Sequence, residues 1–410
     1  MKKKLLSALV LLICLSLLAA CGAPATTGGG DTAAPPSGNG GNGADSDLPP
    51  VIIGTTMPLT GTQANPGNDA LRGIQLAIMH INAAGGMNGH PVELIAYDSQ
   101  GIPEEAVRGV TRLIEVDNIS FMIGDTISSC LLAAGNIIND SRILTIGTGL
   151  SPTWMEQGWE YIWRACVNNG RTMPVAAQTA FDMGIRTMGV MHGQDDANMS
   201  AWVAFDEAGS AIGLTFPTVE SYVEGDTDFS GQIARIIATN PDAVLLSSHG
   251  PTMGAFLRQL RAQGFNGIVF VKETFTTDSI DQAGPASDGV VFIYPYVTYN
   301  SPDEASDPLM IAFLEAFLAE FGQMPIQEHA YRAYDSMMVL AHAANLAGSN
   351  ETEAVMAALG TVSGFRALVG YLDFTNGDRE GVGGQIGGFA VIGGRYVPLE
   401  DWDHVAFMNQ

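Results

Sequence analysis

The sequence predicts an α/β protein with two doubly wound, parallel-sheet lobes that are joined by several crossovers. Apolar runs of strand length alternate with amphipathic segments of helix length, which is typical of parallel sheets covered by helices on both faces. Roughly 360 residues follow Val51, which is more than one hydrophobic core usually accommodates. The alternation also breaks off near residues 161–165 and then begins again, so the second lobe repeats the plan of the first.

The first series supplies the elements of one lobe. Asn68-Asp69 is expected to cap the first helix, whose apolar stripe recurs at helical spacing: Leu71, Ile74, Ile78 and Ile81. Gly85-Gly86 ends that helix. The predicted strands are 51–55, 91–97, 121–123 and 143–146, and the helices between them include 103–116 and a helix that begins at Ser128-Ser129.

The second series supplies the other lobe and the end of the chain. Its predicted helices are 171–183, 200–212, 229–238 and 253–263, and its strands are 187–191, 216–223, 243–247, 268–271 and 290–294. Long helices at 308–321 and 330–347 and strands at 371–374 and 389–397 follow. We therefore expect lobe 1 at residues 51–168 and 295–368, lobe 2 at residues 169–294 and 369–410, and a hinged cleft between them.

The stretch from Phe121 to Cys130 is the first candidate binding element. A buried strand runs into a loop and then into a helix start that carries Ser128 and Ser129. The unpaired N–H groups and positive dipole end of a helix start suit a carboxylate, and ligands of open α/β sheets collect at the carboxyl ends of strands. The alternative is that Ser128 only caps its helix.

The N-terminal residues predict export from the cytoplasm. Lys2-Lys3-Lys4, an apolar run and small residues before Cys21 are typical of a signal peptide at residues 1–20. The ending resembles a bacterial lipobox, so Cys21 is expected to carry the lipid that anchors the protein to the outer face of the cell membrane. Residues 21–50 are rich in Gly, Pro, Ala and Ser and are expected to form a disordered tether. The alternative is a plain signal peptide with an incidental cysteine.

The composition and the missing motifs argue against several classes of function. A net charge of −25 disfavours binding to nucleic acid. The motifs typical of zinc proteases, serine hydrolases and phosphate-binding loops do not occur from Val51 onward, and the seven histidines are scattered. We expect no enzyme activity, no cofactor and no metal. Cys130 and Cys166 are expected either to form a disulfide or to remain as buried free thiols.

Several motifs resemble one protein family from Val51 to about Gly394. They are Pro58-Leu59-Thr60-Gly61, the run from Ile81 to Gly89, Tyr97-Asp98, Ile123-Gly124 followed by Ser128-Ser129, the run from Gly225 to Ser230, Pro241-Asp242-Ala243-Val244 and the run from Leu257 to Arg261. Their order and spacing resemble the branched-chain amino acid (leucine/isoleucine/valine) binding family of type I periplasmic solute-binding proteins. The resemblance implies a monomer that captures a small solute between its lobes, like a Venus flytrap, and delivers it to an ABC transporter permease.

The resemblance also implies which residues hold the solute. Ser128, with Ser129 behind it, would bind the solute carboxylate, and the loop with Thr148, Gly149 and Leu150 would add backbone contacts. From the second lobe, Glu273 would accept hydrogen bonds from the solute ammonium, and His249 stands where the family has an aromatic residue. The alternatives are a surface role for Glu273 and helix capping by His249.

The sequence departs from the family where aromatic walls are expected. Pro66, Ala197-Asn198 and His249 stand at those positions, and Trp154, Trp159, Trp163 and Trp202 are candidates either to replace the walls or to pack in the core. We predict an amino acid-like solute, with branched-chain amino acids first. Short amides such as urea, or aromatic and organic acids, are alternatives. A tethered ligand sensor on the same scaffold is the alternative to transport.

Overall fold

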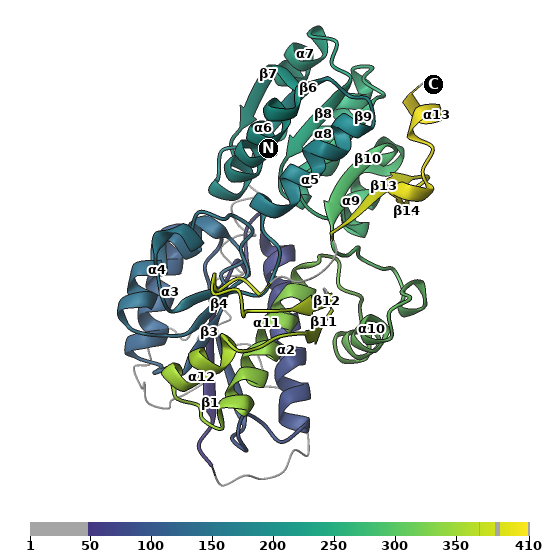
Figure 1. Cartoon of the computed structure of the whole chain (residues 1–410). Helices are drawn as coiled ribbons and strands as arrows, with labels where there is room; N and C mark the ends of the chain where they lie inside the picture. Colours follow the sequence, from purple (N-terminus) through teal and green to yellow (C-terminus); the bar gives the residue numbers. More distant parts are fainter. Residues whose placement is uncertain (1–47, 369, 382–385, 409–410) are drawn as a thin grey trace, which may run out of the picture. The chain divides into compact units, whose positions relative to one another are not determined.

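The computed structural model describes residues 48–368, 370–381 and 386–408, which form two large sheets flanked by helices (Figure 1). The predicted signal peptide, the lipid site Cys21 and the tether up to residue 47 lie outside the described residues. The helices that the structure describes include none long and apolar enough to cross a membrane.

The first sheet has five parallel strands in the order β2-β1-β3-β4-β5. The strands are β1 (Val51–Met57), β2 (Val92–Asp98), β3 (Phe121–Ile123), β4 (Thr145–Gly147) and β5 (Ile162–Arg164). Helices α3 (Pro103–Glu115) and α4 (Ser128–Asp140) cover one face, and α2 (Ala64–Ala83) and α11 (His329–Ala347) cover the other. The sheet is therefore doubly wound.

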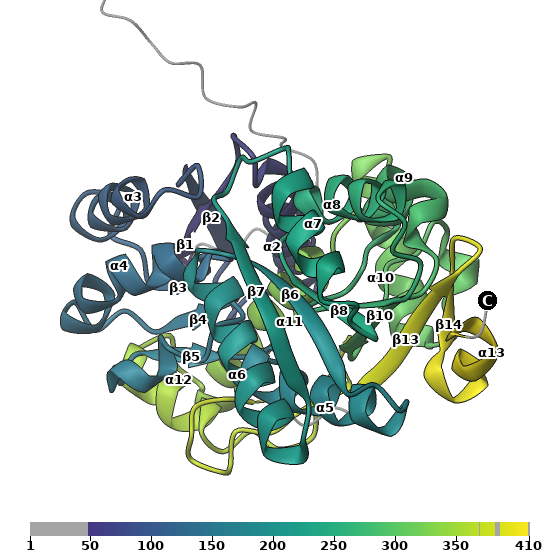
Figure 2. The ribbon, with the colours of Figure 1, turned by 90° about the horizontal axis from the view of Figure 1, so that it is seen from above.

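The second sheet has seven strands in the order β14-β13-β10-β9-β8-β6-β7. Five of them are parallel: β6 (Thr187–Gly193), β7 (Thr215–Tyr222), β8 (Ala243–Ser247), β9 (Ile268–Val271) and β10 (Val290–Tyr294). Helices α5 (Asn169–Asp182) and α6 (Asp196–Ile212) lie on one side of β6 and β7, and α7 (Ser230–Ala238) and α8 (Gly250–Ala262) lie on the other (Figure 2).

An antiparallel hairpin, β13 (Gly387–Ile392) and β14 (Arg395–Pro398), completes the edge of the second sheet beside β10. The described chain thus passes between the two sheets three times: after β5, after β10 and before β13. The other α-helices and strands of the described chain are α9 (Thr277–Ala283), α10 (Pro308–Phe321), α12 (Thr352–Leu359), the short hairpin of β11 (Phe365–Ala367) and β12 (Gly370–Leu372), and α13 (His404–Met408). The predicted fold class, two doubly wound lobes joined by crossovers, is confirmed.

The start of the first helix was predicted wrongly. Helix α2 begins at Ala64, four residues before the predicted Asn68-Asp69 cap. Pro66 is tolerated there because the first turn of a helix needs no intrahelical N–H bonds. The Asp69 carboxylate instead accepts hydrogen bonds from the backbone N–H groups of Ile326 and Gln327, both at 2.7 Å. It ties α2 to the segment that leads into α11.

Candidate functional site

The loop between β3 and α4 places Ser128 as the first residue of its helix and not as the cap. The N-cap residue is Ile127, and no side chain caps the helix. Ser128 is 1 % exposed, and its Oγ accepts a hydrogen bond from the backbone N–H of Ser151 at 3.2 Å. The capping alternative for Ser128 is therefore wrong, because its hydroxyl faces the neighbouring loop. Because no side chain caps α4, the positive end of its dipole remains available to an anion.

Asp125 lies in the same loop with its carboxyl group buried. Its Oδ1 accepts the backbone N–H of Ile127 at 2.9 Å. Burial raises the pKa of Asp125 to about 7, and hydrogen bonds from Ile127 and nearby side chains only partly oppose this effect. Below that pH the carboxyl group is largely neutral, so it does not repel an anion at the adjacent helix start.

The loop after β4 packs directly against Ser128. Thr148, Gly149 and Leu150 are all buried, and a Cβ on Gly149 would lie 2.6 Å from Ser128 Oγ. Glycine is therefore required for this close approach of the loop to the helix start. Thr148 Oγ1 has no hydrogen-bond partner among the described residues. It is one polar group that the loop can offer to a ligand.

A chain of polar contacts connects this loop to the second sheet. Ser151 Oγ lies 2.8 Å from Thr153 Oγ1, which donates to both carboxylate oxygens of Asp196 at 3.0 and 2.9 Å. Asp196 is the first residue of α6. A second contact joins the sheets where Gln63 Nε2 donates to Glu224 Oε1 at 2.9 Å. Side chains of the two lobes therefore meet directly.

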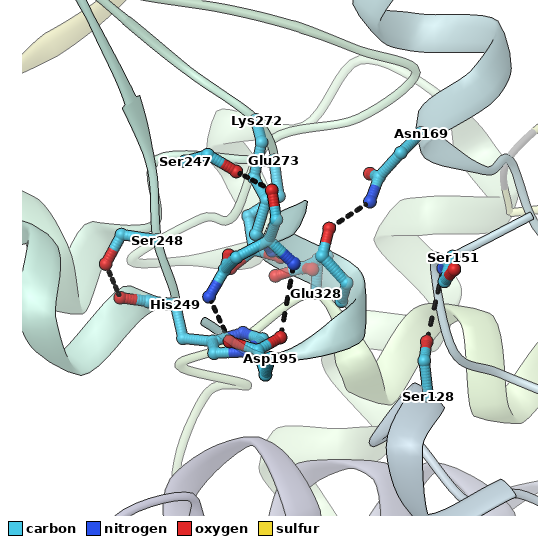
Figure 3. A network of polar contacts seen from close by, with 12 residues as sticks. Ser128, Ser151, Asn169, Asp195, Ser247, Ser248, His249, Lys272, Glu273 and Glu328 are labelled. Atoms are coloured by element: carbon cyan, nitrogen blue, oxygen red, sulfur yellow. Dashed lines mark hydrogen bonds and ion pairs between the residues drawn. The ribbon is translucent and has the colours of Figure 1, made fainter. Parts of the chain in front are cut away.

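Asp195 and His249 form a half-buried ion pair next to these contacts (Figure 3). Asp195 caps α6 by accepting the backbone N–H of Asn198 at 3.1 Å, and its Oδ1 lies 3.2 Å from His249 Nε2. Burial alone would raise the pKa of Asp195 and lower that of His249. The attraction between the two groups outweighs burial, so the pKa of Asp195 lies well below its usual range and that of His249 lies above it. Each group therefore favours the charged form of the other.

His249 stands at the N-cap position of α8, but its side chain makes no capping hydrogen bond. Its ring contacts Asp195 instead, so the capping alternative for His249 is wrong. A cation at a helix start is unfavourable unless an anion compensates for it. Asp195 provides that compensation.

Glu273 lies just past β9 and is 4 % exposed, so a surface role is excluded. Its Oε2 accepts a hydrogen bond from Lys272 Nζ at 2.7 Å, and Lys272 is 1 % exposed. The structure places Glu273, Lys272, His249 and Asp195 together in one network (Figure 3). An ammonium of the chain itself therefore already contacts the carboxylate that was expected to receive the solute.

The predicted residues fall into two groups. Ser128, Thr148, Gly149 and Leu150 lie together at the first sheet, with Ser129 next to them and half-buried. Glu273 and His249 lie together at the second sheet. Sequence reasoning missed four residues that contact these groups: Asp125, Thr153, Asp195 and Lys272. Among these residues, only Lys272 could have been found from the sequence, because a Lys-Glu pair directly after an apolar strand indicates a buried ion pair.

The tryptophans are buried or packed against other side chains. Trp154 is fully buried, and the guanidinium of Arg164 lies 3.9 Å from its ring centre. Trp154 Nε1 is 3.3 Å from the position of a Cβ on Gly149, so this ring supports the binding loop from behind. Trp202 packs edge-to-face on Phe216.

Cys130 and Cys166 are both buried free thiols. The part of the chain that the structure describes contains no group of three His, Cys, Asp or Glu side chains that could hold a metal ion. Hydrogen-bonding groups, ion pairs and a helix start thus make up the described site, and this arrangement suits reversible binding of a small polar molecule.

The model of the periplasmic binding protein family matches residues 50–385. The chain belongs to this family. It is a family of extracytoplasmic solute-binding proteins rather than enzymes. Among relatives, the Leu/Ile/Val-binding protein homolog 1 of Brucella suis is 26% identical over 329 residues, which are 79% of this chain and 86% of the relative. The predicted resemblance to the branched-chain amino acid binding proteins is confirmed.

Two solved structures of solute-binding proteins have the same fold as this chain. One is the substrate-binding protein LivJ of Streptococcus pneumoniae in complex with isoleucine, with 21% identity, a TM-score of 0.74 and coverage of 85% of this chain and 99% of LivJ. The other is a solute-binding protein of Rhodopseudomonas palustris in complex with benzoate, with 19% identity, a TM-score of 0.76 and coverage of 85% and 95%. The fold therefore serves more than one class of solute.

Proposed function

We propose that this protein captures a small, carboxylate-bearing, amino acid-like solute between its two lobes and delivers it to an ABC transporter permease. The observation that supports this most is the polar chain from Ser128 through Ser151 and Thr153 to Asp196, because it links an anion-binding helix start to the second lobe. Closure of the lobes over a solute would stabilise these contacts.

On family grounds, branched-chain amino acids are the first candidates for the solute. The relative from Brucella suis carries that name, and the LivJ structure holds isoleucine. Aromatic and organic acids are the second class, since the Rhodopseudomonas palustris neighbour holds benzoate. Both classes share a carboxylate, the group expected at Ser128. Short amides and a sensing role remain alternatives without a structural observation in their favour.

A thermal-shift screen over amino acids, amides and organic acids tests the proposal, because a ligand that binds only the folded state raises the melting temperature. With the best ligand, Ser128→Ala should weaken binding roughly 10- to 100-fold, the effect of losing one hydrogen bond to a charged group. Ser230→Ala is the matched control, because Ser230 also begins a helix but is exposed. Equal affinity of Ser128→Ala and the parent protein would refute the carboxylate assignment.

The lipid anchor at Cys21 is also part of this proposal. Its support is the small-residue run before Cys21 and the Gly- and Pro-rich segment after it. Labelling with a radioactive or clickable fatty acid in a bacterial host should mark the parent protein, and Cys21→Ser should abolish the label. Labelling of Cys21→Ser at the parent level would show that Cys21 is not the lipid site.

A further inference from the structure

A group of buried polar side chains lies where the chain crosses from the second sheet back to the first. Tyr294 ends β10, Tyr296 lies in the crossover, and Glu328 and Arg332 stand at the start of α11. Arg332, Tyr294 and Glu328 are each 1 % exposed, and Tyr296 is 4 % exposed. The two tyrosine rings pack edge-to-face with their centroids 5.0 Å apart. This packing fixes the positions of both hydroxyl groups.

These side chains present polar atoms that no other described residue satisfies. Arg332 Nε and Nη1 and both tyrosine hydroxyl groups have no hydrogen-bond partner in the described part of the chain. Arg332 Nη2 lies 3.9 Å from Glu328 Oε1, which is an ion pair but too long for a hydrogen bond. Nearly all buried polar groups in proteins are hydrogen-bonded. Four orphaned groups on three neighbouring side chains therefore indicate a partner from outside the chain.

The charge of Arg332 is well defined. Burial would lower the pKa of the guanidinium, but its interactions with Tyr294, Glu328 and Tyr296 outweigh burial and raise it. Glu328 is ionised as well, since His329 and Arg332 outweigh its burial and lower its pKa to about 2. Arg332 thus keeps a full positive charge. The Glu328 carboxylate lies close to it but accepts no hydrogen bond from Nε or Nη1 of Arg332. A rigid array of such donors suits an oxygen acceptor.

The cluster is continuous with both groups of the candidate site. On one side, Glu273 interacts electrostatically with Tyr294 and with His329, the residue next to Glu328. On the other side, Arg332 interacts electrostatically with Cys166, whose Sγ lies 3.8 Å from the carbonyl oxygen of Thr148 in the binding loop. Arg332 therefore lies near both groups of the candidate site.

We propose that Arg332, with the hydroxyl groups of Tyr294 and Tyr296, forms a subsite for a second oxygen acceptor on the solute, a carboxylate or a carboxamide. The inference rests on the proposed function, in which Ser128 holds the first carboxylate. It changes the expected solute from a branched-chain amino acid to one with an acidic or amide side chain, because an aliphatic side chain leaves the donors of Arg332 unpaired in the closed protein. Buried donors without partners strongly disfavour such an analogue.

Calorimetric titration with matched ligands tests this subsite. Leucine, asparagine and aspartate branch at the same carbon, and methionine, glutamine and glutamate have similar lengths. At least one oxygen-bearing ligand should bind roughly 10-fold or more tightly than its apolar match. Comparison of aspartate with asparagine, and of glutamate with glutamine, then identifies the acceptor as carboxylate or carboxamide.

Arg332→Met should weaken the preferred ligand roughly 30-fold or more, and it should leave the affinity of the apolar match unchanged or raise it, because the unpaired donors are removed. Arg108→Met is the control, because the side chain of Arg108 is 64% exposed on α3. If Arg332→Met does not fold, Tyr296→Phe keeps the ring and removes only the hydroxyl, and a selective loss of roughly 5- to 10-fold is expected. If Arg332→Met or Tyr296→Phe weakens the oxygen-bearing ligand and its apolar match by the same factor, the proposed subsite is refuted.

The two proposals fail in different ways. If leucine or methionine binds as tightly as its oxygen-bearing partners, the subsite is refuted while the proposed function stands. Binding of an organic acid without a second acceptor, and of no amino acid, also refutes the subsite. If no amino acid or organic acid binds, the proposed function fails and the inference fails with it.

Discussion

Substitution of Asp125 by asparagine should change how the stability of the protein depends on pH. The carboxyl group is 1 % exposed, and its pKa rises from 3.8 to about 7 on folding because burial disfavours the charged form. A raised pKa means that the folded state binds the proton more tightly than the unfolded state. The resulting stabilisation is fully present below about pH 4 and is lost as the pH rises towards 7.

The size of the effect follows from the shift. Each unit of pKa difference corresponds to about 1.4 kcal/mol, so the shift predicts a loss of about 4 kcal/mol in the free energy of unfolding between about pH 4 and pH 7. Asparagine mimics the neutral carboxyl group and keeps the oxygen that accepts the N–H of Ile127. Asp125→Asn should therefore match the parent protein near pH 4.5 and exceed it by up to about 4 kcal/mol near pH 8.

Urea unfolding followed by circular dichroism at pH 4.5, 6 and 7.5 measures this difference. Asp69, whose burial raises its pKa to about 6 against the opposing effects of Gln327 and Arg72, contributes in the same direction, but it is common to both proteins and cancels. Asp140→Asn, at the exposed end of α4, is the control and should leave the pH profile unchanged. Parallel profiles for Asp125→Asn and the parent protein would show that the Asp125 carboxyl group is not held neutral in the loop.

Two further substitutions test the contacts of the second lobe. Lys272→Met leaves the Glu273 carboxylate buried without its cation and should lower the free energy of unfolding by roughly 3–5 kcal/mol in urea titrations; an unchanged midpoint would mean that solvent reaches Glu273. Thr153→Val removes the hydroxyl that donates to Asp196 and should weaken solute binding by roughly 10-fold with a loss of stability below about 1 kcal/mol. Unchanged affinity would show that this contact does not depend on lobe closure.

The strands that pack inside the sheets could be predicted closely from the sequence. The bounds of β3, β8, β9 and β10 agree with the predicted ranges, because short apolar runs between turn residues leave little freedom for a buried parallel strand. The short helices α9 and α12 were missed, since they are too brief to show a clear helical period.

The helix starts were harder to predict, for a physical reason that Asp69 and Ser128 illustrate. Both residues are of types that commonly cap helices. Asp69 was predicted as a cap, and capping was the alternative to solute binding for Ser128. In the structure, their side chains accept hydrogen bonds from backbone groups of distant segments, Ile326 for Asp69 and Ser151 for Ser128. A local preference and a tertiary contact require the same polar side chain, and the sequence alone does not distinguish between them.

The same limit explains why residues at the helix starts could be proposed from the sequence, whereas the charged partners around them could not. Ser128, Asp195, His249 and Glu328 all stand at helix starts, where unpaired N–H groups create positive potential. Carboxylates are stabilised at such positions, whereas a protonated His249 is compensated there by the Asp195 carboxylate. Helix starts from both lobes thus supply positive potential and fixed carboxylates together. A solute that carries both an anionic group and a hydrogen-bond donor complements this arrangement better than either group alone.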